Sequence, residues 1–366
     1  MKITCLKENL SKALSLTSKI IPLKPSLPIL GNILIQTEKG MLKISSTNLE
    51  LGIICKIGAK ITEEGSITVP AKLFTEYIST IPDDKIEITV NDLDVEIISG
   101  NYNAKIKGLS ASDFPLIPLI DKESIIKINP KILSEALPYI TFSVSIDESR
   151  PVLNGVLFDI YPDKIKLVST DSYRLSEKII ELKTNTKENL SVVIPQKTVQ
   201  ELLRMLTETE EEVEISLTEE QILFRTSNIE LTSRLIEGKY PDYEQIIPES
   251  WQTKIVLNKD EFISAIKTVS LFARETAGNI KLETSKEGKI IVKSMATQIG
   301  EAQSMVDIGI EGEEIEIAFN AKYLLDVLSV LKSKKVVLLL NGSLNPAVVK
   351  GEEEKDYNHI IMPLRI

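Results

Sequence analysis

The sequence contains few histidine, cysteine and aromatic residues. Its 366 residues include one histidine, two cysteines and one tryptophan, and aromatic residues make up 5%. Cys5 and Cys55 form no CxxC pair, which argues against a zinc cage or a redox motif. We therefore expect two buried thiols in a reducing compartment, no metal and no cofactor. Aliphatic side chains must fill the cores, since hydrophobic residues still make up 43%.

Long apolar runs are also missing. No run approaches the roughly 18 residues that a membrane-spanning helix needs, so we expect no membrane partner. The charged start, Met1 to Glu8, is unlike a signal peptide. The cytoplasm is the expected location. A formal net charge of −10 argues against general nucleic-acid binding and favours solubility.

One unit is repeated three times along the chain. Residues 65–72, 190–197 and 315–322 each contain a short alternating strand, a break, a lysine and the start of an amphipathic helix. Pro70, Pro195 and Asn320 occupy the same place in each copy, 125 residues apart. The first half of the unit repeats as well, because residues 27–32 match residues 150–155. Turns at 39–40, 162–163 and 287–288 each precede a predicted strand, at 41–45, 164–168 and 289–293.

Six helices are predicted, two in each copy, over residues 7–24, 70–80, 130–146, 195–207, 259–275 and 320–335. Apolar spacing of three and four marks the first helix of each copy. The buried face is expected to contain Leu10, Ala13 and Leu14; Ile132, Leu133, Ala136 and Leu137; and Phe262, Ile266 and Val269. Pro130 is typical of a helix start and Asn258 with Glu261 of a capping pair, whereas Pro138 should stop or kink its helix.

The pattern predicts an α+β fold of three similar domains. Alternating apolar residues over 86–90 and 93–97, across Asn91-Asp92, indicate a hairpin. Antiparallel sheets with one buried face, backed by two helices, fit each copy. Two proline-containing linkers, at 115–124 and 247–252, separate the copies. We place the domains at 1–120, 125–248 and 252–366.

Basic residues concentrate on the predicted helices. These six segments contain 15 Lys or Arg and 8 Asp or Glu, whereas the remainder contains 28 basic and 45 acidic residues. Lys12 with Lys19, Lys197 with Arg204, and Lys267 with Arg274 are each seven residues apart and share a helix face. Lys332, Lys334 and Lys335 cluster at the end of the last helix. One explanation is that the helices have ordinary solvated faces, with basic C-termini that suit the helix dipole. Taken together with the three-fold repeat, the pattern instead suggests helices that all face one polyanion.

Five stretches carry the most specific motifs of the chain: residues 25–32, 153–158, 169–175, 240–243 and the C-terminal 362–366. Together they resemble the bacterial DNA polymerase III beta subunit family. The resemblance implies a head-to-tail homodimeric ring of six similar domains, with sheets outside and helices lining a hole for double-stranded DNA. It implies a sliding clamp and processivity factor rather than an enzyme. The implied partners are the polymerase III catalytic subunit, the clamp loader, and other replication and repair proteins.

The resemblance also implies a peptide-binding groove between the second and third domains, where partners dock a short motif with an apolar end. The matching positions are Leu153, Thr170, Ser172, Tyr173, Arg174, Leu175, Pro241, Ile246, Leu344, Ile360, Met362, Pro363, Leu364 and Arg365. The alternative is that Leu153, Leu175 and Ile360 are only core residues. The groove's rim departs from the usual family pattern, because Ser172-Tyr173 replaces a more usual Gly-His, Gln245 a basic residue and Pro346 a small polar residue.

Candidate DNA-facing residues have two sources. The family resemblance suggests Lys24 and the loop from Asp147 to Val152, although Asp147 and Glu148 weaken that loop as a contact. The helix charge count adds Lys12, Lys19, Lys197, Arg204, Lys267 and Lys332, each of which could be an ordinary solvated cation. For the dimer seam, the resemblance suggests the segments 103–109 and 271–272.

Two other functions fit parts of the sequence. A hydrolase could use Asp171 and Asp242, but the sequence has one histidine, His359, and lacks GxGxxG, P-loop, HExxH and GxSxG motifs. A repeat scaffold without DNA would share the fold and the groove but lack a basic inner face. Acidic residues are common enough here that a chance carboxylate pair is expected.

Overall fold

The protein folds into two compact units, each built on one antiparallel sheet. The computed structural model describes residues 1–22, 24–118, 120, 123–273, 277–285, 287–294 and 300–365. Unit 1 contains residues 1–134, 183–187 and 197–236, and unit 2 contains residues 135–182, 188–196 and 237–366. The second predicted repeat therefore contributes to both units.

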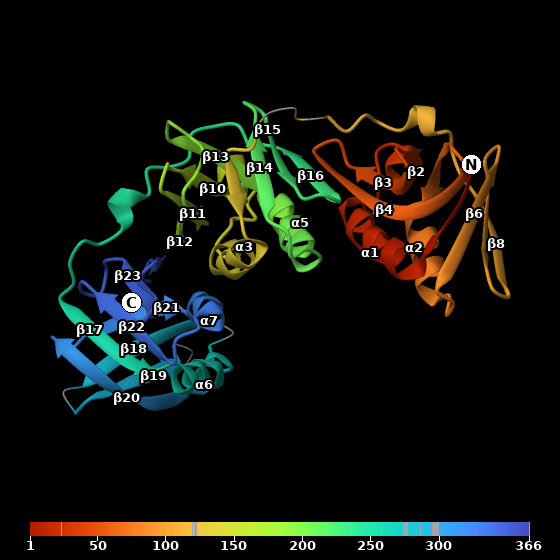
Figure 1. Cartoon of the computed structure of the whole chain (residues 1–366). Helices are drawn as coiled ribbons and strands as arrows, with labels where there is room; N and C mark the ends of the chain where they lie inside the picture. The colour runs from red at the N-terminus through yellow and green to blue at the C-terminus, as the bar shows by residue number, and fades with distance from the viewer. Residues whose placement is uncertain are drawn as a thin grey trace. The chain divides into compact units, whose positions relative to one another are not determined.

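Unit 1 has a 12-stranded sheet with the order β8-β7-β6-β1-β4-β16-β15-β14-β9, and β2, β3 and β5 attach through β3 to β4. Its strands are β1 (Lys2–Leu6), β2 (Asn32–Glu38), β3 (Met41–Thr47), β4 (Leu51–Glu63), β5 (Ser66–Pro70), β6 (Lys85–Asn91), β7 (Asp94–Ser99), β8 (Tyr102–Lys107), β9 (Ile126–Ile128), β14 (Val213–Leu217), β15 (Gln221–Arg225) and β16 (Ile229–Arg234). Helices α1 (Lys7–Thr17) and α2 (Ala71–Thr80) lie side by side (Figure 1). Most of α3 (Pro130–Ala136) and α5 (Gln196–Thr207) also belongs to this unit.

Unit 2 has a second 12-stranded sheet, ordered β13-β10-β11-β12-β24-β23-β22-β17-β20-β19-β18-β21. Its strands are β10 (Gly155–Ile160), β11 (Lys164–Thr170), β12 (Arg174–Glu181), β13 (Leu190–Pro195), β17 (Thr253–Asn258), β18 (Asn279–Ser285), β19 (Lys289–Ser294), β20 (Gln303–Gly312), β21 (Glu316–Asn320), β22 (Lys335–Leu340), β23 (Ala347–Gly351) and β24 (Tyr357–Ile361). Helices α6 (Lys259–Ser270) and α7 (Ala321–Val330) pack together (Figure 1), and α4 (Pro138–Thr141) contacts β12.

The apolar periodicity of the helices explains how they pack. Leu10, Leu14, Phe262 and Ile266 are fully buried, and each such side chain contributes roughly 1.5–3 kcal/mol to folding. The α+β class with antiparallel sheets is confirmed. Ile132 is an exception, because its side chain is 42% exposed and the expectation that it faces the core is wrong.

The predicted helices are longer than the observed ones. The first α-helix ends at Thr17 and continues as a 3-10 turn to Ile20, and the last ends at Val330, so Lys332 and Lys334 follow it and Lys335 opens β22. The 130–146 segment is interrupted as expected, because α3 ends at Ala136 and α4 starts at Pro138. Helix α6 ends at Ser270, and Arg274 lies outside the described residues.

Local sequence signals set several element ends. The α3 helix starts at Pro130, and the Asn258 side chain accepts hydrogen bonds from the backbone N–H groups of Asp260 and Glu261, as predicted. The β6–β7 hairpin forms, but its two-residue loop is Asp92-Leu93 rather than Asn91-Asp92, since Asn91 pairs with Asp94. Asp92 takes a positive φ of 55°, which aspartate tolerates in such loops.

Candidate functional site

The turn between β11 and β12 is held by its own side chains. The Asp171 carboxylate accepts hydrogen bonds at 3.0 Å from the backbone N–H groups of Tyr173 and Arg174. The Thr170 hydroxyl accepts from Ser172 N at 3.1 Å and donates to Arg174 O at 2.7 Å. Ser172 takes a φ of 75°, and the Tyr173 side chain is 63% exposed. The turn thereby presents an aromatic ring to solvent on a rigid support.

Arg174 connects this turn to two other elements of unit 2. Its guanidinium donates to the Asp171 carboxylate at 2.9 Å, to the Asp326 carboxylate at 2.6 Å and to the carbonyl of Phe142 at 2.6 Å. The guanidinium carbon also lies 4.4 Å from the ring centroid of Tyr323. The side chain is only 7% exposed, so its charge depends on these acceptors.

A hollow of about 540 Å³ adjoins the turn. It is lined by Phe142, Val144, Ser145, Ile146, Asp147, Arg150, Leu153, Asp171, Ser172, Tyr173, Arg174, Gln196, Lys322 and Tyr323. Four of the predicted groove residues are therefore brought together here, namely Leu153, Ser172, Tyr173 and Arg174. The predicted loop at 147–152 contributes Asp147 and Arg150, and Arg150 donates to the Ser172 hydroxyl at 3.1 Å.

The other predicted groove residues do not line this hollow. Leu175 and Ile360 pair across β12 and β24 and are 2% and 1% exposed, so both contribute to the core. Met362 is 38% exposed, and its backbone N–H donates to Tyr173 O at 2.9 Å, which places it beside the turn. Leu364 N donates to Ala318 O at 2.9 Å. Of the remaining members, Thr170 is buried. The others are exposed or partly exposed: Pro241, Ile246, Leu344, Pro363 and Arg365.

Buried polar residues that sequence reasoning missed lie behind the turn. The Ser176 hydroxyl is 2.8 Å from His359 Nδ1 and 2.8 Å from the Ser143 hydroxyl, and all three residues are fully buried. Burial, together with the nearby Arg174 charge, lowers the pKa of His359 to about 3. The chain's single histidine was a signal for such a site, whereas nothing in the sequence pointed to Asp326 or Tyr323.

The two carboxylates of the hydrolase hypothesis have structural roles. Asp171 shapes its turn and pairs with Arg174, and Asp242 accepts a hydrogen bond from the Gln245 side chain at 2.6 Å. In the part of the chain that the structure describes, no group of three or more His, Cys, Asp or Glu is placed to hold a metal ion.

All seven candidate DNA-facing cations are exposed. Three of them make ion pairs, since Lys12 pairs with Glu8, Arg204 with Glu201 and Lys332 with Glu135. Lys197 lies 3.5 Å from the carbonyl of Ile20. Lys19, Lys24 and Lys267 make no ion pair with any residue that the structure describes. The ammonium groups of these three lysines are therefore the most available to bind a polyanion.

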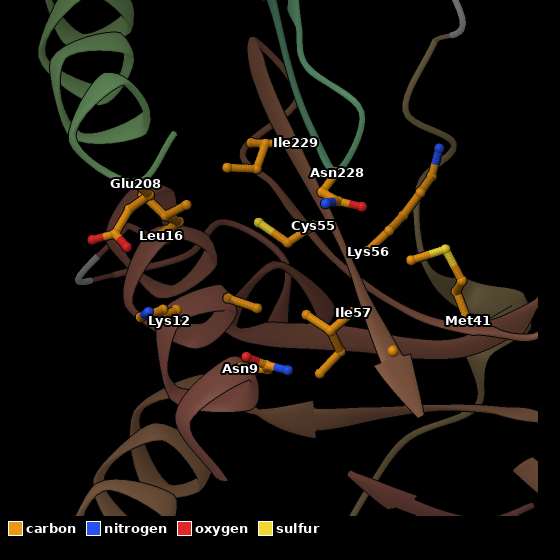
Figure 2. Close-up of a pocket in the computed structure, with 12 residues that line it drawn as sticks. Asn9, Lys12, Leu16, Met41, Cys55, Lys56, Ile57, Glu208, Asn228 and Ile229 are labelled. Carbon is orange, nitrogen blue, oxygen red and sulfur yellow. The ribbon is translucent and has the colours of Figure 1, made fainter. Parts of the chain in front are cut away.

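Lys12 also borders a second hollow, of about 310 Å³, within unit 1. Figure 2 shows Lys12 and Glu208 at one side of the hollow and Met41 at the other, with Cys55 and Ile57 between them. The Lys12 ammonium thus lies near two carboxylates, those of Glu8 and Glu208. Both cysteines are buried free thiols, as expected, and burial raises the pKa of each to about 12. Cys55 is therefore a poor nucleophile at neutral pH.

Comparison with known proteins decides the family. Three family models match: the N-terminal domain of the DNA polymerase III beta subunit at residues 1–118, its central domain at 127–242 and its C-terminal domain at 244–365. A beta sliding clamp from Staphylococcus epidermidis is 31% identical, with 100% of this chain and 99% of the relative covered. The chain belongs to the DNA polymerase III beta subunit family.

Solved structures agree with this assignment. The DNA polymerase sliding clamp of Bacillus subtilis is 30% identical, with a TM-score of 0.95 over 100% of this chain and 99% of that one. The beta subunit from Thermotoga maritima is 26% identical, with a TM-score of 0.95 over 100% and 99%. As a member of the family, the chain is a DNA sliding clamp: it tethers a DNA polymerase for processive synthesis and is not an enzyme. No helix in the described ranges is long and apolar enough to cross a membrane.

Proposed function

We propose that two copies of this chain join head to tail into a closed ring around duplex DNA. The support comes from how the repeats share strands. The first half of β4, in the first repeat, pairs with β16, which is the last strand of the second repeat. In the same way, β12 pairs with β24, the last strand of the third repeat. The first and second repeats thus each complete their sheet with the last strand of the repeat that follows.

The third repeat and the first repeat each leave one such edge open. Residues 303–307 of β20 pair only with β19 among the described strands, and β8, the last strand of the first repeat, pairs only with β7. Open edges invite pairing with another chain. A β20–β8 pairing between copies would extend the same rule, and two such seams close a ring.

Exposed apolar side chains near both open edges support this seam. Tyr102 and Leu109 are 46% and 40% exposed at the β8 edge. Leu271, Phe272 and Met305 are 54%, 37% and 59% exposed in the third repeat. These residues include members of both predicted seam segments, and burying them between copies would stabilise a dimer.

The ring would hold DNA without reading its sequence. Exposed cations on and beside the helices would face the phosphates, above all Lys19 in the 3-10 turn after α1, Lys24 beyond that turn and Lys267 on α6. Lys12, Lys197, Arg204 and Lys332 would contribute less. Phosphate contacts are sequence-independent and weakened by salt, which permits sliding. Retention then comes from topology rather than from affinity.

Partner proteins would dock at the surface around the β11–β12 turn and the C-terminal strand. The polymerase III catalytic subunit, the clamp loader, and other replication and repair proteins would each insert a short apolar motif beside Tyr173 and Met362, with Leu344 and Ile246 at the rim. This proposal keeps the domains at 1–120, 125–248 and 252–366, and the cytoplasm, where DNA is replicated, as the location.

Sedimentation equilibrium tests the ring's stoichiometry. We expect a mass twice the 40.8 kDa of one chain. The double variant Leu271→Asp with Phe272→Asp should shift the protein to the mass of one chain, since charges would be buried at the seam. Leu73→Asp, at a similarly exposed leucine of α2, should leave the dimer intact. A wild-type protein that stays at 40.8 kDa at every concentration would refute the ring.

A further inference from the structure

The turn that supports Tyr173 has a counterpart in unit 1. Leu49 takes a φ of 78°, like the 75° of Ser172. The Thr47 hydroxyl donates to Leu51 O and accepts from Leu49 N, both at 3.0 Å, as Thr170 does in its own turn. The Asn48 side chain accepts from Glu50 N at 3.1 Å and Leu51 N at 2.8 Å, as Asp171 accepts from Tyr173 N and Arg174 N. The same hydrogen bonds therefore build both turns.

The strands beside the two turns correspond as well. Arg234 N donates to Glu50 O at 2.9 Å, just as Met362 N donates to Tyr173 O at 2.9 Å. In register, Leu51 pairs with Ser233, and Arg174 pairs with Ile361. Arg234 thus occupies in unit 1 the place that Met362 occupies in unit 2.

A hollow of about 300 Å³ adjoins this turn, entirely within unit 1. It is lined by Thr47, Leu49, Glu50, Leu51, Gly52, Leu116, Ile117, Pro118, Gln221, Thr232 and Arg234. Leu49 and Leu116 are 51% and 95% exposed, so the hollow has an aliphatic rim. Ile117 packs on Gly52, where an added Cβ would lie 2.8 Å from its Cγ2, and both residues line the hollow.

We propose that this hollow is a second peptide-binding site, and that it takes an extended segment with an aliphatic side chain next to a single carboxylate. The aliphatic side chain would pack between Leu49 and Leu116. The carboxylate would bind Arg234, which is exposed and makes no ion pair with any described residue. Glu50, at the place of Tyr173, disfavours a run of acidic residues, so one carboxylate fits better than several.

The two sites would therefore select different peptides. Arg234 in place of Met362 and Thr232 in place of Ile360 make the unit 1 site more polar. A charge-assisted hydrogen bond from a guanidinium to a carboxylate is stronger than a neutral one, so the carboxylate should decide binding here. This inference rests on the proposal that the surface around Met362 binds peptides, because the repeat relates the two sites.

The test uses two peptides with blocked ends, Ser-Leu-Asp-Leu-Ser and Ser-Leu-Asn-Leu-Ser, each labelled with an uncharged fluorophore, and a Met362→Asp background that disables the unit 2 site. We expect the aspartate peptide to bind this background about tenfold more tightly than the asparagine peptide, by fluorescence anisotropy. Arg234→Met should remove that difference, while Lys60→Met, at another exposed cation of unit 1, should retain it. Circular dichroism verifies that each variant folds.

The outcomes separate this inference from the peptide-groove proposal. The second site would be overturned if the aspartate peptide does not bind the Met362→Asp protein, or if Arg234→Met leaves its affinity unchanged. Either result counts regardless of how the wild-type protein binds the peptide. The unit 2 site is judged separately, by whether Met362→Asp removes binding of an apolar partner-derived peptide that carries no carboxylate. Either proposal can therefore fail while the result for the other remains interpretable.

Discussion

Arg174 donates a hydrogen bond to the Asp326 carboxylate at 2.6 Å, which ties the β11–β12 turn to helix α7 inside unit 2. Truncation to alanine would leave Asp326 and the Phe142 carbonyl without this donor. We expect Arg174→Ala to lower the free energy of unfolding by about 3–5 kcal/mol, because one partner of a largely buried ion pair is removed. Urea denaturation measures this loss.

The matched control is Lys254→Ala. Lys254 pairs with Glu311 on the surface of the same unit, where an ion pair contributes roughly 0–1 kcal/mol. An Arg174→Ala protein no less stable than Lys254→Ala would contradict the role given to Arg174.

His359 makes stability depend on pH in a defined direction. Its pKa is about 3 in the folded chain, below the ordinary 6.5, so the unfolded chain takes up the proton first as pH falls. The contribution of the buried, neutral His359 to the free energy of unfolding is complete above pH 6.5. As pH falls below 6.5, the free energy of unfolding should decrease by about 1.4 kcal/mol per pH unit. Denaturation between pH 7 and pH 5 should show a flatter profile for His359→Asn.

The single histidine also permits a direct check. Its imidazole proton signals in NMR spectra should not titrate between pH 7 and pH 5. A midpoint near pH 6.5 in the folded protein would show that the ring is accessible to protons, and would remove the predicted slope.

Much of the fold could be predicted from the sequence, because the repeated unit shows the same order of helices, turns and strands three times. Helix positions, the Pro138 interruption and the Asn258 cap depend on local signals that a sequence shows directly. Ile132 was misplaced because it fits the helical period, yet its side chain is exposed. The helix ends at Thr17 and Val330 were missed because apolar spacing does not indicate where a 3-10 turn begins or a strand follows.

The candidate site was harder to predict. Residues 170–175 were found because they are contiguous and resemble a family stretch. Asp326, Phe142 and Tyr323 were not, since they meet Arg174 only through tertiary packing of distant segments. The repeat-related turn at 47–51 was also missed, because its side chains differ from those of the second copy while its hydrogen bonds do not.

Three exposed lysines should account for much of the electrostatic attraction to DNA. The triple variant of Lys19, Lys24 and Lys267 to alanine should weaken binding of a labelled short duplex at low salt. Because a ring of two copies loses six lysines in this variant, the slope of log affinity against log salt should also fall by at most ~5.4, at ~0.9 per phosphate contact. A triple variant of Lys60, Lys183 and Lys355, which are exposed outside the helices, should change neither. Equal effects of the two triple variants would contradict the assignment.

Met362→Asp should disable the peptide groove of unit 2. Met362 is partly exposed beside Tyr173, and a carboxylate there would be desolvated by an apolar motif. We expect at least tenfold weaker binding of a fluorescent peptide from the polymerase catalytic subunit, measured by anisotropy, with no change in dimer mass. Leu73→Asp serves as the control, and unchanged peptide affinity in Met362→Asp would remove this groove assignment.

Release by cutting the DNA tests the closed ring most directly. The protein is loaded with its clamp loader onto a nicked circular duplex, separated from free protein by gel filtration, and the DNA is then linearised. A ring held by topology slides off the new ends, so the protein should leave the DNA fraction within minutes while it stays on uncut circles. Equal retention on cut and uncut DNA would show that contacts, and not encirclement, hold the protein, and would contradict the account.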